Sequence, residues 1–141
     1  MSRILAIDYG KKRTGIAVTD PLQMIPGALT TVDTNELFAF LKKYISSEDV
    51  SLFVVGDPRN WDGTDTDATP LVRACIKRLQ KVFPSIPVVT IDERNTSKLA
   101  RQAMLDMGMK KKQRRDKAMV DKIAATLILQ DYLDSRNTGK T

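Results

Sequence analysis

The sequence predicts an α/β fold in which a five-stranded mixed sheet is flanked by helices. Two short apolar segments, 3–8 and 13–19, are separated by a glycine-bearing turn, which is the pattern of a β-hairpin. Later strand segments alternate with amphipathic segments, which indicates strands connected by helices that cover the sheet. With 141 residues the chain has the usual size of one domain. We therefore expect one domain over 1–136 and a disordered tail over 137–141.

The first half of the chain predicts three adjacent strands, a helix and a fourth strand. The third strand is expected at 27–32, after the hairpin. A helix then begins at Thr34, a suitable N-cap residue. Its apolar side chains recur at helical spacing: Leu37, Phe38, Leu41, Tyr44 and Ile45. The run "SLFVVGDP", 51–58, is continuously apolar until Gly and Pro, as in a buried parallel strand.

The second half alternates helices with one more strand. A polar loop, "RNWDGTDTDAT", precedes a helix expected at 70–83, where Cys75 lies among apolar residues and is predicted to pack in the core. A strand follows at 86–94. Two further helices are expected, one at about 96–107 that Gly108 ends and one at 117–133, with the basic loop "KKKQRRDK" between them.

Composition limits the partner and the chemistry. Lys plus Arg number 23 against 17 Asp plus Glu, and the net charge of +6 favours a polyanion, either nucleic acid or an anionic membrane. No signal peptide is recognisable and the run "IAATLIL" is too short to span a bilayer, so a soluble cytoplasmic protein is expected. The chain has no His, which excludes Ser-His and Cys-His pairs and leaves carboxylates, lysines, hydroxyls and bound hard metals.

Two carboxylates occupy matching strand ends. Asp8 closes the first strand and shares a face with Ile4 and Ala6, because side chains alternate along a strand. Glu93 lies in the same way near the end of the strand at 86–94. Ligands collect beyond the carboxyl ends of parallel strands, where both acids are expected. Taken singly, Asp8, which stands two residues before Gly10, also fits a plain turn, and Glu93 fits a surface ion pair.

Asp121, near the start of the last helix, is a third candidate. The small residues Ala124 and Ala125 would let this helix approach the sheet closely. Three carboxylates without compensating charge would repel, and a divalent cation removes that conflict. Ligation by oxygen alone suits Mg²⁺ or Mn²⁺, which can clamp a phosphodiester and orient water. As an alternative to metal binding, the Asp121 carboxylate near the start of the helix could simply interact favourably with the helix dipole.

Four segments resemble successive motifs of one known family. They are "AIDYGKKRTGIAVTD", "VVGDP" followed by "WDG", "IDERNTS" and "VDKIAATLILQDYL". Together they are similar to the YqgF family, the RuvC-like Holliday junction resolvases with an RNase H-like fold, over residues 3–134. The resemblance implies a five-stranded mixed sheet and a metal-dependent nuclease site with Asp8, Glu93 and Asp121 as its acids. It also implies a cytoplasmic bacterial protein that cleaves at the 5′ end of precursor 16S ribosomal RNA, or alternatively one that resolves DNA junctions.

Basic residues flank the candidate acids. Lys11, Lys12 and Arg13 follow Asp8, where they can contact phosphates and give salt-sensitive binding with little sequence selectivity. The basic loop before Asp121 adds further candidates for phosphate contact: Lys110, Lys111, Lys112, Arg114 and Arg115. Arg94 can orient Glu93, contact a phosphate or form a surface salt bridge. Tyr9 can contact substrate or fill the opposite face of the sheet.

We therefore expect an Mg²⁺- or Mn²⁺-dependent endonuclease that acts on structured nucleic acid, with precursor rRNA preferred over branched DNA as its substrate. Ribosomal particles are further expected partners, a membrane is not, and the chain is expected to be a monomer or a weak homodimer. A non-catalytic RNA-binding or ribosome-associated protein is the second hypothesis. A phosphate loop of the sugar-kinase and actin type ranks last, because the chain is too short for the usual two-domain cleft.

Overall fold

A computed structural model describes residues 2–58, 64–92, 102 and 117–137. Its five strands form one sheet in the order β3-β2-β1-β4-β5. The strands are β1 (Arg3–Asp8), β2 (Arg13–Thr19), β3 (Pro26–Asp33), β4 (Val50–Asp57) and β5 (Val88–Asp92). β2 runs antiparallel to both β1 and β3, whereas β1, β4 and β5 are parallel to one another. The predicted mixed sheet with an antiparallel portion is confirmed.

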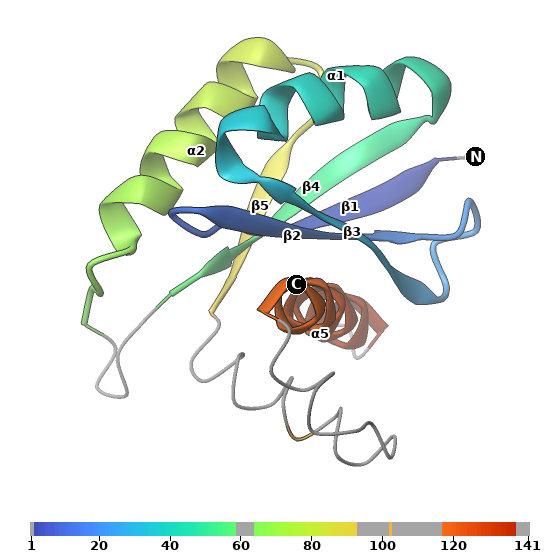
Figure 1. Ribbon diagram of the computed structural model, residues 1–141. Helices are drawn as coiled ribbons and strands as arrows, with labels where there is room; N and C mark the ends of the chain where they lie inside the picture. Colours follow the sequence, from blue (N-terminus) through green and yellow to red (C-terminus); the bar gives the residue numbers. More distant parts are fainter. Residues whose placement is uncertain (1, 59–63, 93–101, 103–116, 138–141) are drawn as a thin grey trace.

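Helices cover both faces of this sheet (Figure 1). The short 3-10 turn η1 (Thr34–Glu36) leads into α1 (Leu37–Ser47), which lies with α2 (Thr69–Val82) on one face. The long helix α5 (Lys117–Asn137) lies on the other face. No helix within the described ranges is long and apolar enough to cross a membrane.

Alternation along the strands produces one core on each side of the sheet. Leu5 and Ile7 of β1 belong to the core under α1 and α2, whereas Ile4 and Ala6 pack against α5. Cys75 of α2 is buried in the first core, as predicted, and this burial raises the pKa of its thiol to about 12. A thiol with such a pKa stays protonated at neutral pH and acts as a small apolar side chain.

Several predicted boundaries shift. β5 begins at Val88 rather than at 86, because the Ile86 N–H donates to the Phe83 carbonyl in a turn. α5 continues beyond Leu133 to Asn137, and Arg136 in its last turn donates to the backbone oxygen of Gln23 at 2.9 Å. The helix predicted at about 96–107 lies outside the described residues except for Gln102.

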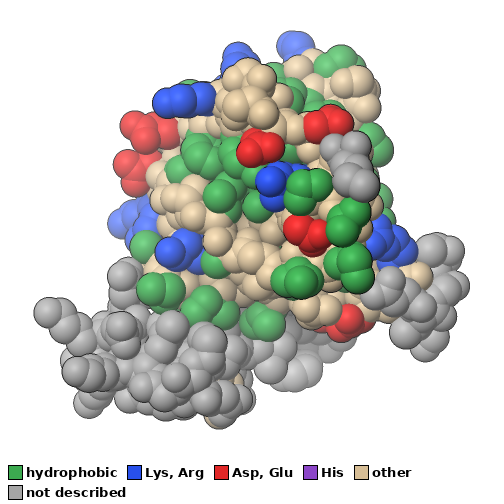
Figure 2. All heavy atoms as spheres, turned by 90° about the vertical axis from the view of Figure 1, so that its right-hand side faces the viewer, with side chains coloured by type: hydrophobic (Ala, Val, Ile, Leu, Met, Phe, Trp, Pro, Cys, Tyr) green, Lys and Arg blue, Asp and Glu red, His purple; other side chains and the backbone are tan. Residues whose placement is uncertain are grey.

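The turn between β2 and β3 lies at the opposite end of β1 from Asp8. Asp20 organises it by accepting hydrogen bonds from the backbone N–H groups of Leu22, Met24 and Ile25, the last at 2.7 Å. The bond from Ile25 is the main cause of the lowered pKa of Asp20. The same three residues are exposed hydrophobic side chains. Figure 2 views this end of the molecule, where hydrophobic and charged side chains are interspersed.

Candidate metal and nucleic-acid site

Three adjacent parallel strands end in carboxylates at one edge of the sheet. β1 ends at Asp8, β4 at Asp57 and β5 at Asp92. Asp8 continues the face of Ile4 and Ala6 toward α5, as predicted from alternation. Asp57 and Asp92 are register partners, and by alternation along their strands they lie on the opposite face of the sheet from Asp8. The sequence had not assigned these two acids to the site, although their places at strand ends are the same signal that selected Asp8.

The first turns of α5 bring Asp121 to the strand pair that carries Asp8. Asp8 is the register partner of Gly15 in β2. A Cβ atom built on Gly15 would collide with the backbone carbonyl group of Asp121. The helix therefore rests directly on the strand at the residue opposite Asp8. The predicted close approach of this helix is confirmed: Ala125 is fully buried against the sheet, and Gly15 makes room for the main chain of Asp121.

Two further contacts hold this end of α5 on the sheet. The Thr31 hydroxyl of β3 donates to the Ala118 carbonyl oxygen at 2.6 Å. Arg13 Nε donates to Asp121 Oδ2 at 3.1 Å. Arg13 and Gly15 lie on the same face of β2, so this ion pair and the Gly15 contact hold α5 on that face. Arg13 was expected to contact phosphate, and in the structure its partner is a candidate metal ligand.

The loop after Asp8 is fixed by Thr34. Its hydroxyl donates to the Gly10 carbonyl oxygen at 2.6 Å, and its backbone N–H donates to the Lys12 carbonyl oxygen at 3.0 Å. Since the proton of Thr34 is used in this way, the fully buried Thr14 donates its own to Thr34 Oγ1 at 2.9 Å. The prediction that Thr34 caps a helix is wrong, because the loop takes its hydroxyl and η1 precedes α1.

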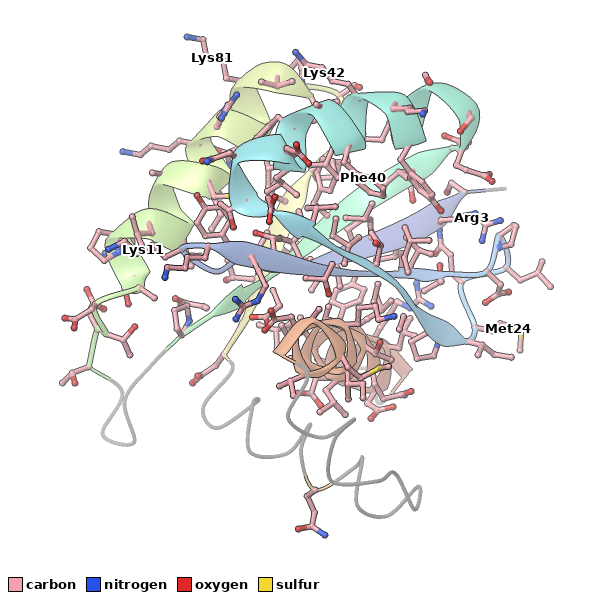
Figure 3. All side chains as sticks on the ribbon, viewed as in Figure 1. Arg3, Lys11, Met24, Phe40, Lys42 and Lys81 are labelled. Carbon is pink, nitrogen blue, oxygen red and sulfur yellow. The ribbon has the colours of Figure 1, made fainter. Side chains whose placement is uncertain are left out.

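The side chains of this loop differ in how exposed they are and in which face of the sheet they pack against. Lys11 and Lys12 are exposed, whereas Tyr9 is partly buried and packs against the core under α1 and α2. Its burial raises the pKa of the Tyr9 hydroxyl. Of the two roles predicted for Tyr9, packing on the opposite face is the one seen. Figure 3 shows Lys11 extending beside the first turn of α2.

The other predicted site residues lie outside the described residues. They are Glu93, Arg94, Lys110, Lys111, Lys112, Arg114 and Arg115. Val89 and Ile91, which precede Glu93 on alternate positions of β5, pack on the side of α5. Within the described part of the chain, no three His, Cys, Asp or Glu side chains are grouped closely enough to hold a metal ion. Asp8 and Asp121 are thus the described members of the candidate site.

Comparison with solved structures defines the fold class. RuvC from T. thermophilus, solved in complex with Holliday junction substrate, matches with a TM-score of 0.59. The match covers 99% of this chain and 98% of that chain at 15% sequence identity. With its five-stranded mixed sheet and flanking helices, the chain has the RNase H-like fold that the sequence predicted.

The chain belongs to the family described as "RuvX: Holliday junction resolvase", whose model matches residues 2–135. The resemblance to the YqgF family is thereby confirmed. A protein of Porphyromonas gingivalis named "Putative pre-16S rRNA nuclease" is 51% identical over 96% of this chain and 98% of its own length. A protein of the same name from Phocaeicola vulgatus is 53% identical over the same shares.

Proposed function

We propose that this chain is a divalent-metal-dependent endonuclease that processes the 5′ end of precursor 16S rRNA. The relatives' shared name and their similarity over nearly the whole chain support this assignment. The observation that carries it is the contact of Asp121 with Gly15, opposite Asp8. This contact brings the main chain of Asp121 to the strand residue that pairs with Asp8, beside a loop of basic residues.

The donor chemistry of these residues fits a hard cation. Asp8 and Asp121 offer carboxylate oxygens, the ligands that Mg²⁺ and Mn²⁺ prefer, and Glu93 follows directly after β5. These three residues would hold the ion. A bound divalent ion supplies Lewis-acid polarisation of a phosphoryl oxygen and an acidified water. Arg13 orients the Asp121 carboxylate and offsets its charge, which limits repulsion between the acids.

Basic side chains are assigned to the nucleic-acid backbone. Lys11 and Lys12 are exposed beside Asp8, and the loop that carries them is held by Thr34. We assign the same role to the remaining predicted residues: Arg94, Lys110, Lys111, Lys112, Arg114 and Arg115. The net charge of +6 is consistent with a polyanionic substrate. Ribosomal particles as partners, a cytoplasmic location and a monomer or weak homodimer stay predictions.

The test offers the purified full chain two substrates with Mg²⁺ or Mn²⁺ and maps the products. One is a precursor 16S rRNA fragment that contains the 5′ processing site, and the other is a four-way DNA junction. We expect cleavage of the RNA near the mature 5′ end. Asp8→Asn and Asp121→Asn should each lower the cleavage rate about 100-fold or more, because metal ligation contributes several kcal/mol to the transition state.

Asp134→Asn is the matched control, because Asp134 lies exposed on α5 and accepts a hydrogen bond from Gln130. It should cleave like the unmodified chain. Cleavage at the normal rate by Asp8→Asn at equal metal concentration contradicts the assignment. The family description favours a second function, junction resolution. If the four-way junction is cleaved and the RNA fragment is not, junction resolution is the function. If the RNA is bound but not cleaved, the chain is the non-catalytic alternative.

A further inference from the structure

A pocket of about 400 Å³ opens beside the end of β1, on the opposite side of the sheet from α5. Its walls come from the loop after Asp8 and from the start of α2. Among the described residues it is lined by Tyr9, Lys11, Asp67, Ala68, Pro70 and Leu71. We call this cavity the Tyr9 pocket. Its volume lies within the range of small-molecule sites.

The walls of the Tyr9 pocket are held by hydrogen bonds. On one side, Thr34 fixes the carbonyl groups of Gly10 and Lys12 and so the loop that carries Lys11. On the other side, Thr69 Oγ1 accepts from the Thr66 N–H at 2.9 Å and donates to the Pro58 carbonyl oxygen at 3.2 Å. Both walls are therefore in place before a ligand arrives, which lowers the entropy cost of binding.

The lining of the Tyr9 pocket combines apolar and charged side chains. Tyr9 provides an aromatic ring, and Leu71 is an exposed hydrophobic residue at 40% exposure. Lys11 and Asp67, both exposed, add one positive and one negative group. A nucleotide matches this set, because its flat base stacks on aromatic rings, its amino groups donate to carboxylates and its phosphate attracts an ammonium group.

The pocket and the candidate metal site lie on two sides of one strand end. Asp8 faces α5, whereas the next residue, Tyr9, packs toward α1 and α2. Their Cα atoms are about 3.8 Å apart, as in any trans peptide. One nucleotide that crosses the end of β1 can therefore place its phosphate beside Lys11, at the strand end where Asp8 would hold a metal ion, and its base at Tyr9. Only a base that is released from pairing can turn away from its strand in this manner.

We propose that the Tyr9 pocket binds an unpaired nucleobase of the substrate next to the phosphate at Asp8. This inference rests on the proposed function and narrows its substrate class to strands with an unpaired nucleotide beside the cleaved bond. Tyr9 stacks on the base, and Leu71 covers its edge. Lys11 contacts the adjoining phosphate.

The test measures binding in metal-free buffer, so that cleavage does not enter. Fluorescence anisotropy compares three labelled RNA hairpins, with one unpaired nucleotide, with an abasic site at that position, or fully paired. The full chain should bind the first about 10-fold more tightly than the second, the scale of one base–aromatic stack. Tyr9→Leu should abolish this preference and leave the affinity for the paired hairpin unchanged, whereas Tyr9→Phe should retain it.

Leu71→Glu gives an independent variant, because its exposed position does not endanger folding, and it should also abolish the preference. Melting curves of each variant verify the fold. An undiminished preference in either Tyr9→Leu or Leu71→Glu overturns the proposal. Free AMP, CMP, GMP and UMP are titrated as well, and tight binding of a free nucleotide without preference among the hairpins would overturn the assignment to the substrate strand.

Asp8→Asn separates this proposal from the proposed function, because it should lose cleavage and keep the preference for the unpaired base. Metal-dependent cleavage by a chain without that preference refutes the Tyr9 pocket alone. A preference that depends on Tyr9, in a chain that cleaves no substrate, refutes the nuclease assignment alone.

Discussion

Replacing Gly15 with Ala should separate α5 from the sheet at the point where Asp121 meets β2. The added Cβ would overlap the carbonyl oxygen and carbon of Asp121 and lie 3.1 Å from the Lys122 nitrogen. Real Cβ atoms essentially never come closer than 3.0 Å to a heavy atom outside their own residue and its chain neighbours. Because these obstacles are backbone atoms, no side-chain rotation relieves them, and the helix must shift.

The expected loss follows from overpacking, which costs about 1–3 kcal/mol in well-packed cores. A backbone obstacle places Gly15→Ala at the upper end, about 3 kcal/mol. This loss corresponds to a fall in melting temperature of about 10 °C for a chain of this size. Urea denaturation followed by circular dichroism measures the free energy of unfolding. Cleavage should also fall, since Asp121 moves with the helix.

Gly27→Ala is the matched control. Gly27 lies in the neighbouring strand β3, and among the described residues a Cβ there would meet only the Val18 carbonyl oxygen, at an ordinary 3.8 Å. Its free energy of unfolding should stay within about 0.5 kcal/mol of the unmodified chain. Equal stability of Gly15→Ala and Gly27→Ala would show that α5 does not rest on Gly15 and would remove the support for an approach of Asp121 to Asp8.

Three other predictions concern single side chains. Arg13→Gln should raise Mn²⁺ affinity about 10-fold in calorimetry, because the loss of a positive charge 3.1 Å from Asp121 removes its repulsion of a cation there; a weaker affinity would mean that the loss of the oriented carboxylate outweighs this repulsion. Thr34→Val should lower the free energy of unfolding by about 1–3 kcal/mol in urea, because the Gly10 carbonyl loses its donor, and Thr34→Ser should recover it. Cys75 should resist iodoacetamide at pH 8 until the chain is unfolded, because burial raises its pKa to about 12; rapid alkylation of the folded chain would contradict this burial.

The strands and helices were largely predictable because their signals are local. The continuous apolar run of β4 and the alternation in β1 reflect burial on both faces of the sheet. The role of Thr34 was not predictable in this way. A Thr before an amphipathic helix is a good local N-cap, but the structure uses its hydroxyl to bond Gly10, which is distant in sequence and adjacent only after the strands pair.

Asp8 and Asp121 could each be selected from the sequence, but the contact that Asp121 makes with Arg13 could not. Asp8 was identified from its strand end, and Asp121 from the small residues that follow it. The pairing of Arg13 with Asp121 depends on the register of β2 and on the angle at which α5 crosses it, and neither is encoded in local sequence. Arg13 lies in a basic run and was therefore predicted to bind phosphate, whereas its partner in the structure is the Asp121 carboxylate.

Gly15 carried a signal that would have anticipated the contact. It stands inside the strand "RTGIAVT", where a glycine weakens the strand unless another backbone comes close. Gly15 must lack a side chain because Asp121 approaches this strand with its main chain. A helix held by its backbone, with Arg13 on its carboxylate, keeps Asp121 in one orientation. In the metal site proposed above, this placement would let the Asp121 carboxylate of the helix act together with the Asp8 carboxylate of the strand.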